Sequence, residues 1–222
     1  MAERHDILAG LDDVRRMVLS LGSSADCSRD DWIGRETAIL ARCAECGLPK
    51  IGADAVAGAW QEGCGMHHRY VPEGLTMPQL LDACGASGVK ICNKTIPSGG
   101  EHLPTERGVF EADLGRTMTP TNRQHHPFML DYDAHIAWAK AQGGDGIASA
   151  EQVLYSLLRD SVENDGISFM GGWIRCSNAC GSGFSLGVDW DAVGGLQVAG
   201  FDRSDASWCF GAVPRKFRSI GV

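Results

Sequence analysis

Hydrophobic side chains recur every three or four residues in several stretches of this chain, which is the spacing that places them on one face of a helix. In residues 1–25 the apolar positions of this series are Ile7, Leu8, Leu11, Val14, Met17, Val18 and Leu21. Two further stretches of the same kind begin after an acidic cap residue and end at a glycine. The pattern therefore predicts helices over residues 1–22, 30–47 and 131–143.

Two other stretches begin with a capping box, in which the side chains of two residues three positions apart satisfy each other's backbone N–H groups. Thr76 and Gln79 form the first box, and Ser149 and Gln152 form the second. An apolar stripe follows each box. We therefore predict helices over residues 76–85 and 149–163.

The pattern changes after Asp165, where glycine, serine and aromatic residues become frequent. Short apolar runs at 184–190, 196–201 and 208–213 predict strands or ordered loops. Between the helices, the tract from Val89 to Pro127 has no clear periodicity and is expected to be irregular. Together these elements predict a mainly α fold in one domain over 1–222, with a helical extension over 1–47, a core over 52–190 and an irregular or short-strand C-terminal segment.

Composition narrows the classes of function. The net charge is −8 and the basic residues are scattered, so the sequence shows no basic patch that would bind nucleic acid. The chain lacks both a signal-peptide pattern and a run of about 18 apolar residues, so no membrane association is expected and the expected location is cytoplasmic. The nine cysteines are then expected to be reduced, and the single CxxC of Cys43 and Cys46 has no second pair with which to form a structural zinc site.

The segment 99–107 is the strongest site candidate, because two glycines lead into a dense group of polar side chains. A carboxylate at Glu101 and a hydroxyl at Thr105, brought together by a turn at Pro104, would suit a divalent cation such as magnesium, with His102 beside it. We expect the Glu101 carboxylate to point inward. The alternative is a solvated loop with incidental charges.

Several motifs resemble, in order and spacing, those of the haem-thiolate peroxidases, the family of chloroperoxidase and the unspecific peroxygenases. These motifs are residues 68–81, Glu101-His102 with Thr105, Asn122-Arg123, Arg159-Asp160-Ser161 and Cys180-Gly181-Ser182-Gly183-Phe184. The resemblance spans about 68–187, and it implies a chloroperoxidase-like helical domain, a haem and a divalent cation. The function it implies is peroxide-dependent oxidation of a small organic substrate.

The chain departs from this family at two central positions. The position of the axial cysteine thiolate falls on Ala59, and that of the distal glutamate falls on Gly181. The thiolate favours O–O cleavage and the carboxylate moves the peroxide proton, so both catalytic groups are missing. If activity remains, the resemblance implies His102 as the acid–base group. It also implies Cys64, His67 or His68 as a replacement axial ligand, with Phe184 in the tract that borders the haem.

Three other functions remain open from the sequence. The first is a binding protein on the same scaffold, whose pocket would hold a flat or apolar molecule between residues 52–59 and the aromatic C-terminal segment. Close packing of a helix on 52–62 is the simpler interpretation of the small residues there. The second is a metal-dependent hydrolase or lyase that uses His67, His68, His125 and His126. The third is an interaction module without a small ligand.

Overall fold

The computed structural model describes residues 27–61, 64–65, 67–92, 99–111, 130–164, 167, 172–191, 194–206 and 210–220. Their helices are α2 (Arg29–Glu45), α3 (Ala53–Ala57), α4 (Met77–Ala86), α6 (Tyr132–Ala141) and α7 (Ala150–Asn164). Their strands are β1 (His68–Val71), β2 (Gly108–Glu111), β3 (Trp173–Ala179), β4 (Phe184–Asp191), β5 (Gly195–Asp202), β6 (Phe210–Ala212) and β7 (Lys216–Ser219). The helix expected within 1–25 lies outside the described residues.

Four helices form where the sequence predicted them. Both capping boxes are present, at Thr76 before α4 and at Ser149 before α7. Asp131 caps α6, since its side chain accepts a hydrogen bond from the N–H of Ala134. The second helix begins slightly earlier than predicted, because Ser28 serves as its cap and accepts from the N–H of Asp31.

The prediction of a mainly α fold is wrong, because the protein is a mixed α/β structure with two sheets. A three-stranded sheet has the order β1-β2-β7, and both of its pairings are antiparallel. A four-stranded sheet has the order β5-β4-β3-β6, with β6 parallel to β3. Strands β4, β5 and β6 lie in the predicted C-terminal runs. The strands β1, β2, β3 and β7 were not predicted, and β2 lies within the tract that was expected to be irregular.

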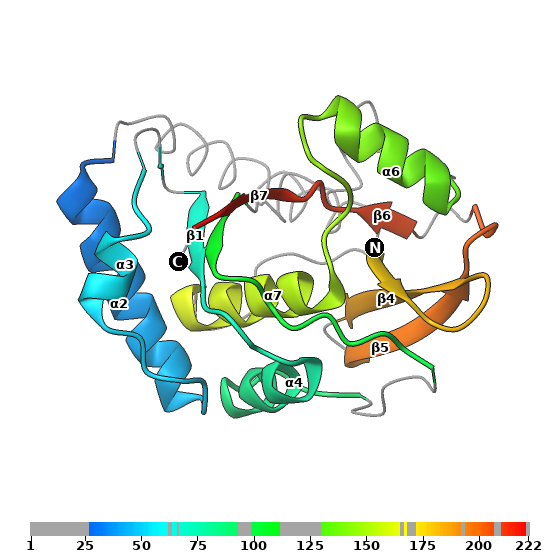
Figure 1. Cartoon of the computed structure of the whole chain (residues 1–222). Coiled ribbons are helices and arrows are strands. Elements are labelled where there is room, and N and C mark those ends of the chain that lie inside the picture. The colour runs from blue at the N-terminus through cyan, green and yellow to red at the C-terminus, as the bar shows by residue number, and fades with distance from the viewer. Residues whose placement is uncertain are drawn as a thin grey trace, which may run out of the picture.

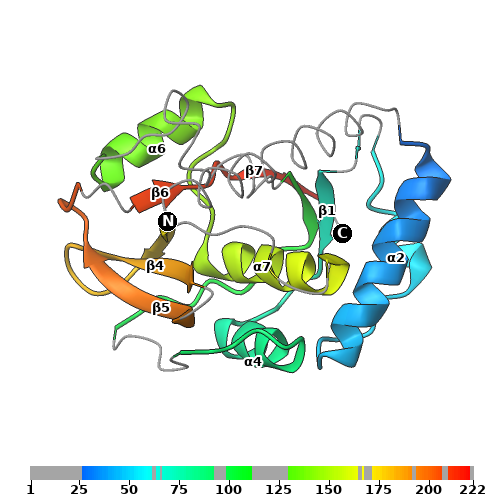
Figure 2. The same ribbon diagram turned by 180° about the vertical axis from the view of Figure 1, so that it is seen from behind.

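Helix α7 runs through the centre of the molecule, with α4 beside it, α2 across one end and β4–β5 at the other (Figures 1 and 2). Every residue from Ala150 to Val162 on this helix is buried, so its polar side chains need partners inside the protein. The main apolar core surrounds it and includes Leu80, Leu154 and Val188. No helix in the described part of the chain is long and apolar enough to cross a bilayer.

A second apolar cluster joins α2 and α3 to strands β1 and β2 of the three-stranded sheet. Trp32, Val56, Ala59, Tyr70 and Val109 are its central members. Close packing of α2 against the small residues of 52–59 is therefore confirmed.

The outer edge of β1 is closed by hydrogen bonds from outside the sheet. The N–H of His68 donates to the Gly65 carbonyl at 2.9 Å, and the Trp32 indole donates to the His68 carbonyl at 2.9 Å. The N–H of Tyr70 donates to Glu36 at 2.7 Å, and the Tyr155 hydroxyl donates to the Tyr70 carbonyl at 2.7 Å. The outward N–H and C=O groups of His68 and Tyr70 thus all have hydrogen-bond partners.

Candidate functional site

The predicted cation ligands Glu101 and Thr105 are held by different parts of the structure. Thr105 is buried, and its hydroxyl accepts from the N–H of Leu75 at 3.0 Å and donates to the Pro72 carbonyl at 2.5 Å. These bonds fix the turn that leads into α4. The threonine hydroxyl is therefore already used in packing this turn.

Glu101 lies on the β3 side of the same loop. Its carboxylate accepts from the N–H of Ala179 at 3.1 Å, and its own N–H donates to the Ala179 carbonyl at 2.7 Å. The expectation that this carboxylate points inward is wrong, because Glu101 is exposed, as is His102. No group of three or more histidine, cysteine or acidic side chains in the described residues is arranged to hold a metal ion.

A buried carboxylate that sequence reasoning missed anchors this loop. Glu151 is fully buried at the start of α7 and accepts from the N–H of Leu103 at 3.2 Å and from the Asn178 amide at 2.9 Å. Burial raises the pKa of Glu151, although these hydrogen bonds act in the opposite direction. An acidic residue in the first turn of a capped helix was a signal for a stabilising N-terminal carboxylate, but not for this tertiary role.

The residues implied by the haem resemblance are divided between two ends of the molecule. Ala59 and Cys64 are buried together in the apolar cluster around Trp32. Gly181 and Phe184 lie at the turn into β4, and both are exposed. Helix α3, which ends just before Ala59, and strand β4 lie at opposite ends of the molecule in both views (Figures 1 and 2). The structure thus groups Ala59 with Cys64 but not with Gly181 or Phe184.

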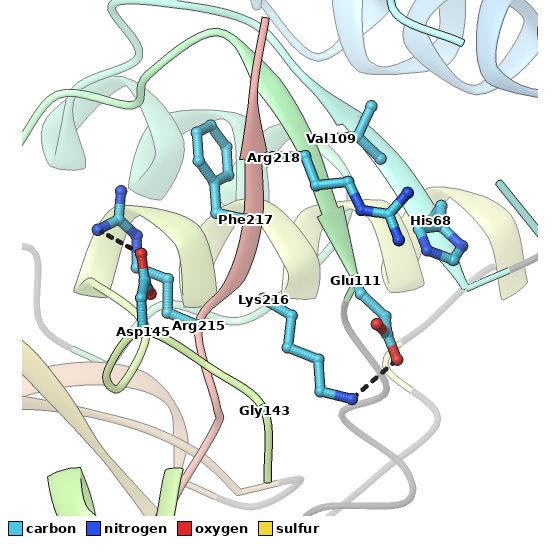
Figure 3. Close-up of a pocket in the computed structure, with 9 residues that line it drawn as sticks. All are labelled: His68, Val109, Glu111, Gly143, Asp145, Arg215, Lys216, Phe217 and Arg218. Atoms are coloured by element: carbon cyan, nitrogen blue, oxygen red, sulfur yellow. Dashed lines mark hydrogen bonds and ion pairs between the residues drawn. The ribbon is translucent and has the colours of Figure 1, made fainter. Parts of the chain in front are cut away.

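His67 immediately precedes β1 and His68 is the first residue of that strand; both side chains are half-buried. His125, His126 and the Asn122-Arg123 pair lie outside the described residues. Of the predicted site residues that the structure describes, His68 alone lines a polar pocket of about 220 Å³, which opens on the three-stranded sheet (Figure 3). The other lining residues are Val109, Glu111, Gly143, Asp145, Arg215, Lys216, Phe217 and Arg218.

Sheet register places the polar side chains of this pocket in two rows. His68 lies opposite Glu111, which in turn lies opposite Lys216. The next row on the same face pairs Val109 with Arg218. Direct cross-strand partners have Cβ atoms about 5 Å apart, so the row that contains His68 forms one continuous polar strip.

The apolar cluster covers this face only at the row of Val109, which is fully buried. The row of Glu111 is left open, because the Lys216 and Glu111 side chains are 36% and 38% exposed. The pocket is therefore the end of this face that α2 and α3 do not cover.

The surroundings of the His68 ring favour its neutral form. The N–H of Gly65 donates to Nδ1 at 2.9 Å, which requires a lone pair on that atom and leaves the ring hydrogen on Nε2. Burial lowers the pKa of His68, and Arg218 acts in the same direction, whereas Glu111 opposes both. At neutral pH the ring therefore offers Nε2–H as a hydrogen-bond donor.

Of the three basic residues that the structure describes in the pocket, two are paired. Arg215 lies 3.1 Å from Glu106 and 3.4 Å from Asp145, and its guanidinium also stacks over the Phe217 ring. Lys216 lies 3.1 Å from Glu111.

Arg218, by contrast, is exposed and has no ion pair within the described residues. Figure 3 shows its guanidinium beside His68. Among the residues that the structure describes, no carboxylate forms an ion pair with this guanidinium.

Sequence reasoning missed the basic members of this pocket. The stretch Lys216-Phe217-Arg218 alternates charged and aromatic residues in the manner of a half-buried strand, and this was the available signal. Its partner strand, β2, gave a weaker signal because it begins with a glycine and its two apolar residues are adjacent rather than alternating.

Comparisons of the chain with protein families, with curated proteins and with solved structures found no match. The resemblance to haem-thiolate peroxidases, the haem and the divalent cation therefore stay predictions that rest on the motifs alone.

Proposed function

We propose that this protein binds a small organic anion, a carboxylate or a phosphate monoester, in the pocket on the β1-β2-β7 sheet. The observation that carries the proposal is the position of Arg218, an exposed guanidinium without an ion pair among the described residues, beside His68 at the wall of the pocket. A guanidinium presents a planar fork of N–H donors that matches the oxygens of a carboxylate or phosphate.

The pairing of the other charges leaves Arg218 as the cation most accessible to a ligand. Among the described residues, Arg215 is paired with Glu106 and Asp145, and Lys216 is paired with Glu111. The charge of Arg218 is therefore the one that a bound anion would neutralise, and a charge-assisted hydrogen bond of this kind is stronger than a neutral one.

His68 supports an oxyanion in a second way. Because Gly65 occupies Nδ1, the neutral ring offers only Nε2–H, which is a donor. A ligand oxygen that bonds to Arg218 could accept from this N–H as well, so two donors from neighbouring rows of one sheet would act on the same group. The anchoring on a sheet favours a pre-organised site, which lowers the entropy cost of binding.

The proposal describes a binding protein for a small polar ligand. It differs from the flat or apolar ligand that the sequence suggested, because the pocket that supports it is lined mainly by charged side chains. It includes no chemical step.

The test is the affinity of the Arg218→Gln variant for propyl phosphate and for butyrate, measured by isothermal titration calorimetry at low salt. Loss of a charged hydrogen bond is expected to weaken binding about tenfold. Comparing the affinities for the two ligands shows whether the pocket prefers a phosphate or a carboxylate. Binding should also weaken as salt is added, since the pocket is open to solvent.

Arg29→Gln is the matched control, because Arg29 is also an exposed arginine and lies on α2, away from the residues that line the pocket. It changes the net charge equally and should leave both affinities unchanged. If neither anion binds the wild-type protein, or if the two variants weaken binding equally, the proposed function is wrong.

A further inference from the structure

We propose that Glu111 makes the pocket selective for anions that also carry a hydrogen-bond donor, a hydroxyl or an ammonium, a short distance from the anionic group. This inference rests on the proposed function and adds the second chemical feature of the ligand. It assigns to Glu111 a role in specificity.

Glu111 occupies the central position of the polar strip. It is the last residue of β2, with His68 opposite it on β1 and Lys216 opposite it on β7. A carboxylate in the middle of an anion pocket is unfavourable for a simple anion. The ion pair with Lys216 uses one of its two oxygens.

One oxygen of this carboxylate is available to a ligand. Oε1 accepts from Lys216 Nζ at 3.1 Å, whereas Oε2 has no hydrogen-bond donor among the described residues. The side chain is 38% exposed, so the second oxygen is accessible from solvent. An ionised carboxylate has room for about four hydrogen bonds, so the bond to Lys216 leaves most of its capacity unused.

The charges of Arg218 and Glu111 divide the pocket into two parts. Figure 3 shows the Arg218 guanidinium beside His68 and the Glu111 carboxylate turned toward Lys216. Arg218 and Glu111 belong to rows two residues apart along the strands, a separation of about 7 Å. One part of the pocket is therefore rich in donors, and the other presents an acceptor.

A ligand that is only an anion would bond to Arg218 and feel repulsion from Glu111, because charges at this separation lie within one Debye length at physiological salt. A ligand with a hydroxyl or ammonium at the other end would replace that repulsion by a hydrogen bond to Oε2. The second kind of ligand uses both parts of the pocket.

The test compares propyl phosphate with glycerol 3-phosphate, which have the same carbon chain and the same phosphate but differ in two hydroxyl groups. Phosphoethanolamine adds the ammonium case. In the wild-type protein both donor-bearing ligands should bind at least about fivefold more tightly than propyl phosphate, as expected for one additional hydrogen bond to a charged group.

In the Glu111→Met variant this preference should fall to about one, because the acceptor is lost. Propyl phosphate itself should bind the variant more tightly, since the repulsion is removed and Lys216 loses its partner. Glu106→Gln is the control, because Glu106 pairs with Arg215 but does not line the pocket. It should leave the ratio of affinities unchanged.

The outcomes separate the two proposals. If propyl phosphate binds and Arg218→Gln weakens it, but the donor-bearing ligands gain nothing or keep their advantage in Glu111→Met, this inference is overturned while the proposed function stands. If none of the three ligands binds the wild-type protein, the proposed function itself has failed. Thermal unfolding of each variant, which should match the wild type, shows that the fold is intact.

Discussion

The Glu36 carboxylate forms a two-contact ion pair with the Arg159 guanidinium, at 2.5 and 2.7 Å, and both side chains are fully buried between α2 and α7. The same carboxylate accepts the N–H of Tyr70 on β1. Glu163 lies 3.1 Å from Arg159 and also contacts Arg35 of α2. One charged group thus links two helices and the edge of a sheet.

Glu36→Gln should lower the free energy of unfolding by about 3 kcal/mol, because removing one partner of a buried ion pair leaves the other charge poorly compensated. Urea denaturation measures this change. Glu45→Gln, on the exposed end of the same helix, is the control and should change the stability by less than about 0.5 kcal/mol. A similar effect of the two substitutions would show that the ion pair contributes little.

Glu151→Gln tests the buried carboxylate that anchors the 99–107 loop. Because the raised pKa means that the folded state holds the proton more tightly than the unfolded state, ionisation costs stability. The wild type should therefore lose stability relative to the variant as the pH rises from the unfolded-state pKa of about 4.3 through the raised folded-state value. Urea denaturation between pH 4 and pH 8 measures the difference. A wild type that instead gained stability with pH would show that the ionised form is favoured.

Thr105→Val should lower the free energy of unfolding by about 2 kcal/mol, since the N–H of Leu75 loses its buried acceptor. Thr105→Ser keeps the hydroxyl and should lose much less. Thermal unfolding of the pair is a direct measurement. Equal losses in the two variants would mean that the methyl group, which only Thr105→Ser removes, contributes as much to stability as the hydroxyl.

Gly108→Ala should destabilise the β2–β7 pair, because an added Cβ would overlap the Phe217 ring and lie 2.5 Å from the Arg218 carbonyl oxygen. Overpacking of this kind costs about 1–3 kcal/mol. The same change should weaken anion binding, since Arg218 lies in the displaced strand. Gly34→Ala on α2 has open space around the new methyl group and is expected to be neutral or stabilising. Unfolding by urea and calorimetric titration distinguish the two variants.

Cysteine alkylation should separate exposed from buried thiols. Burial raises the pKa of Cys43 to about 11, so its thiolate is scarce at pH 8, whereas Cys92 is exposed. Mass spectrometry after brief iodoacetamide treatment should find Cys92 modified first and Cys43 modified only in urea. If Cys92 and Cys43 were alkylated at the same rate in the native protein, Cys43 could not be buried on α2 as the structure shows.

The sequence predicted the elements whose signals are local. Capping boxes identify α4 and α7, because the bonds at Thr76 and Ser149 involve residues only three positions apart. The three-stranded sheet depends instead on pairing His68 with Glu111 and Glu111 with Lys216, and such short strands carry little periodicity of their own. This is why the three-stranded sheet was not predicted.

The candidate site was predictable only in part, for the same reason. His68 was singled out, but its relation to Arg218 appears only when β1 and β7 lie on either side of β2. The acceptor at Glu101 was recognised, yet its direction is set by the backbone of Ala179, far along the chain. Residue type was visible in the sequence, whereas the direction of each side chain depended on long-range pairing.

The closed edge of β1 has a consequence for how this protein behaves at high concentration. An open strand edge can accept a strand from another molecule, which is a route to aggregation and domain swapping. Here the backbone groups of His68 and Tyr70 on that side are already bonded, two of them to the side chains of Glu36 and Trp32 on α2. A neighbouring molecule would have to displace α2 before it could add to β1. Unfolding of α2 is thus the step that would expose this edge, and substitutions that loosen the helix should increase self-association as well as lower stability.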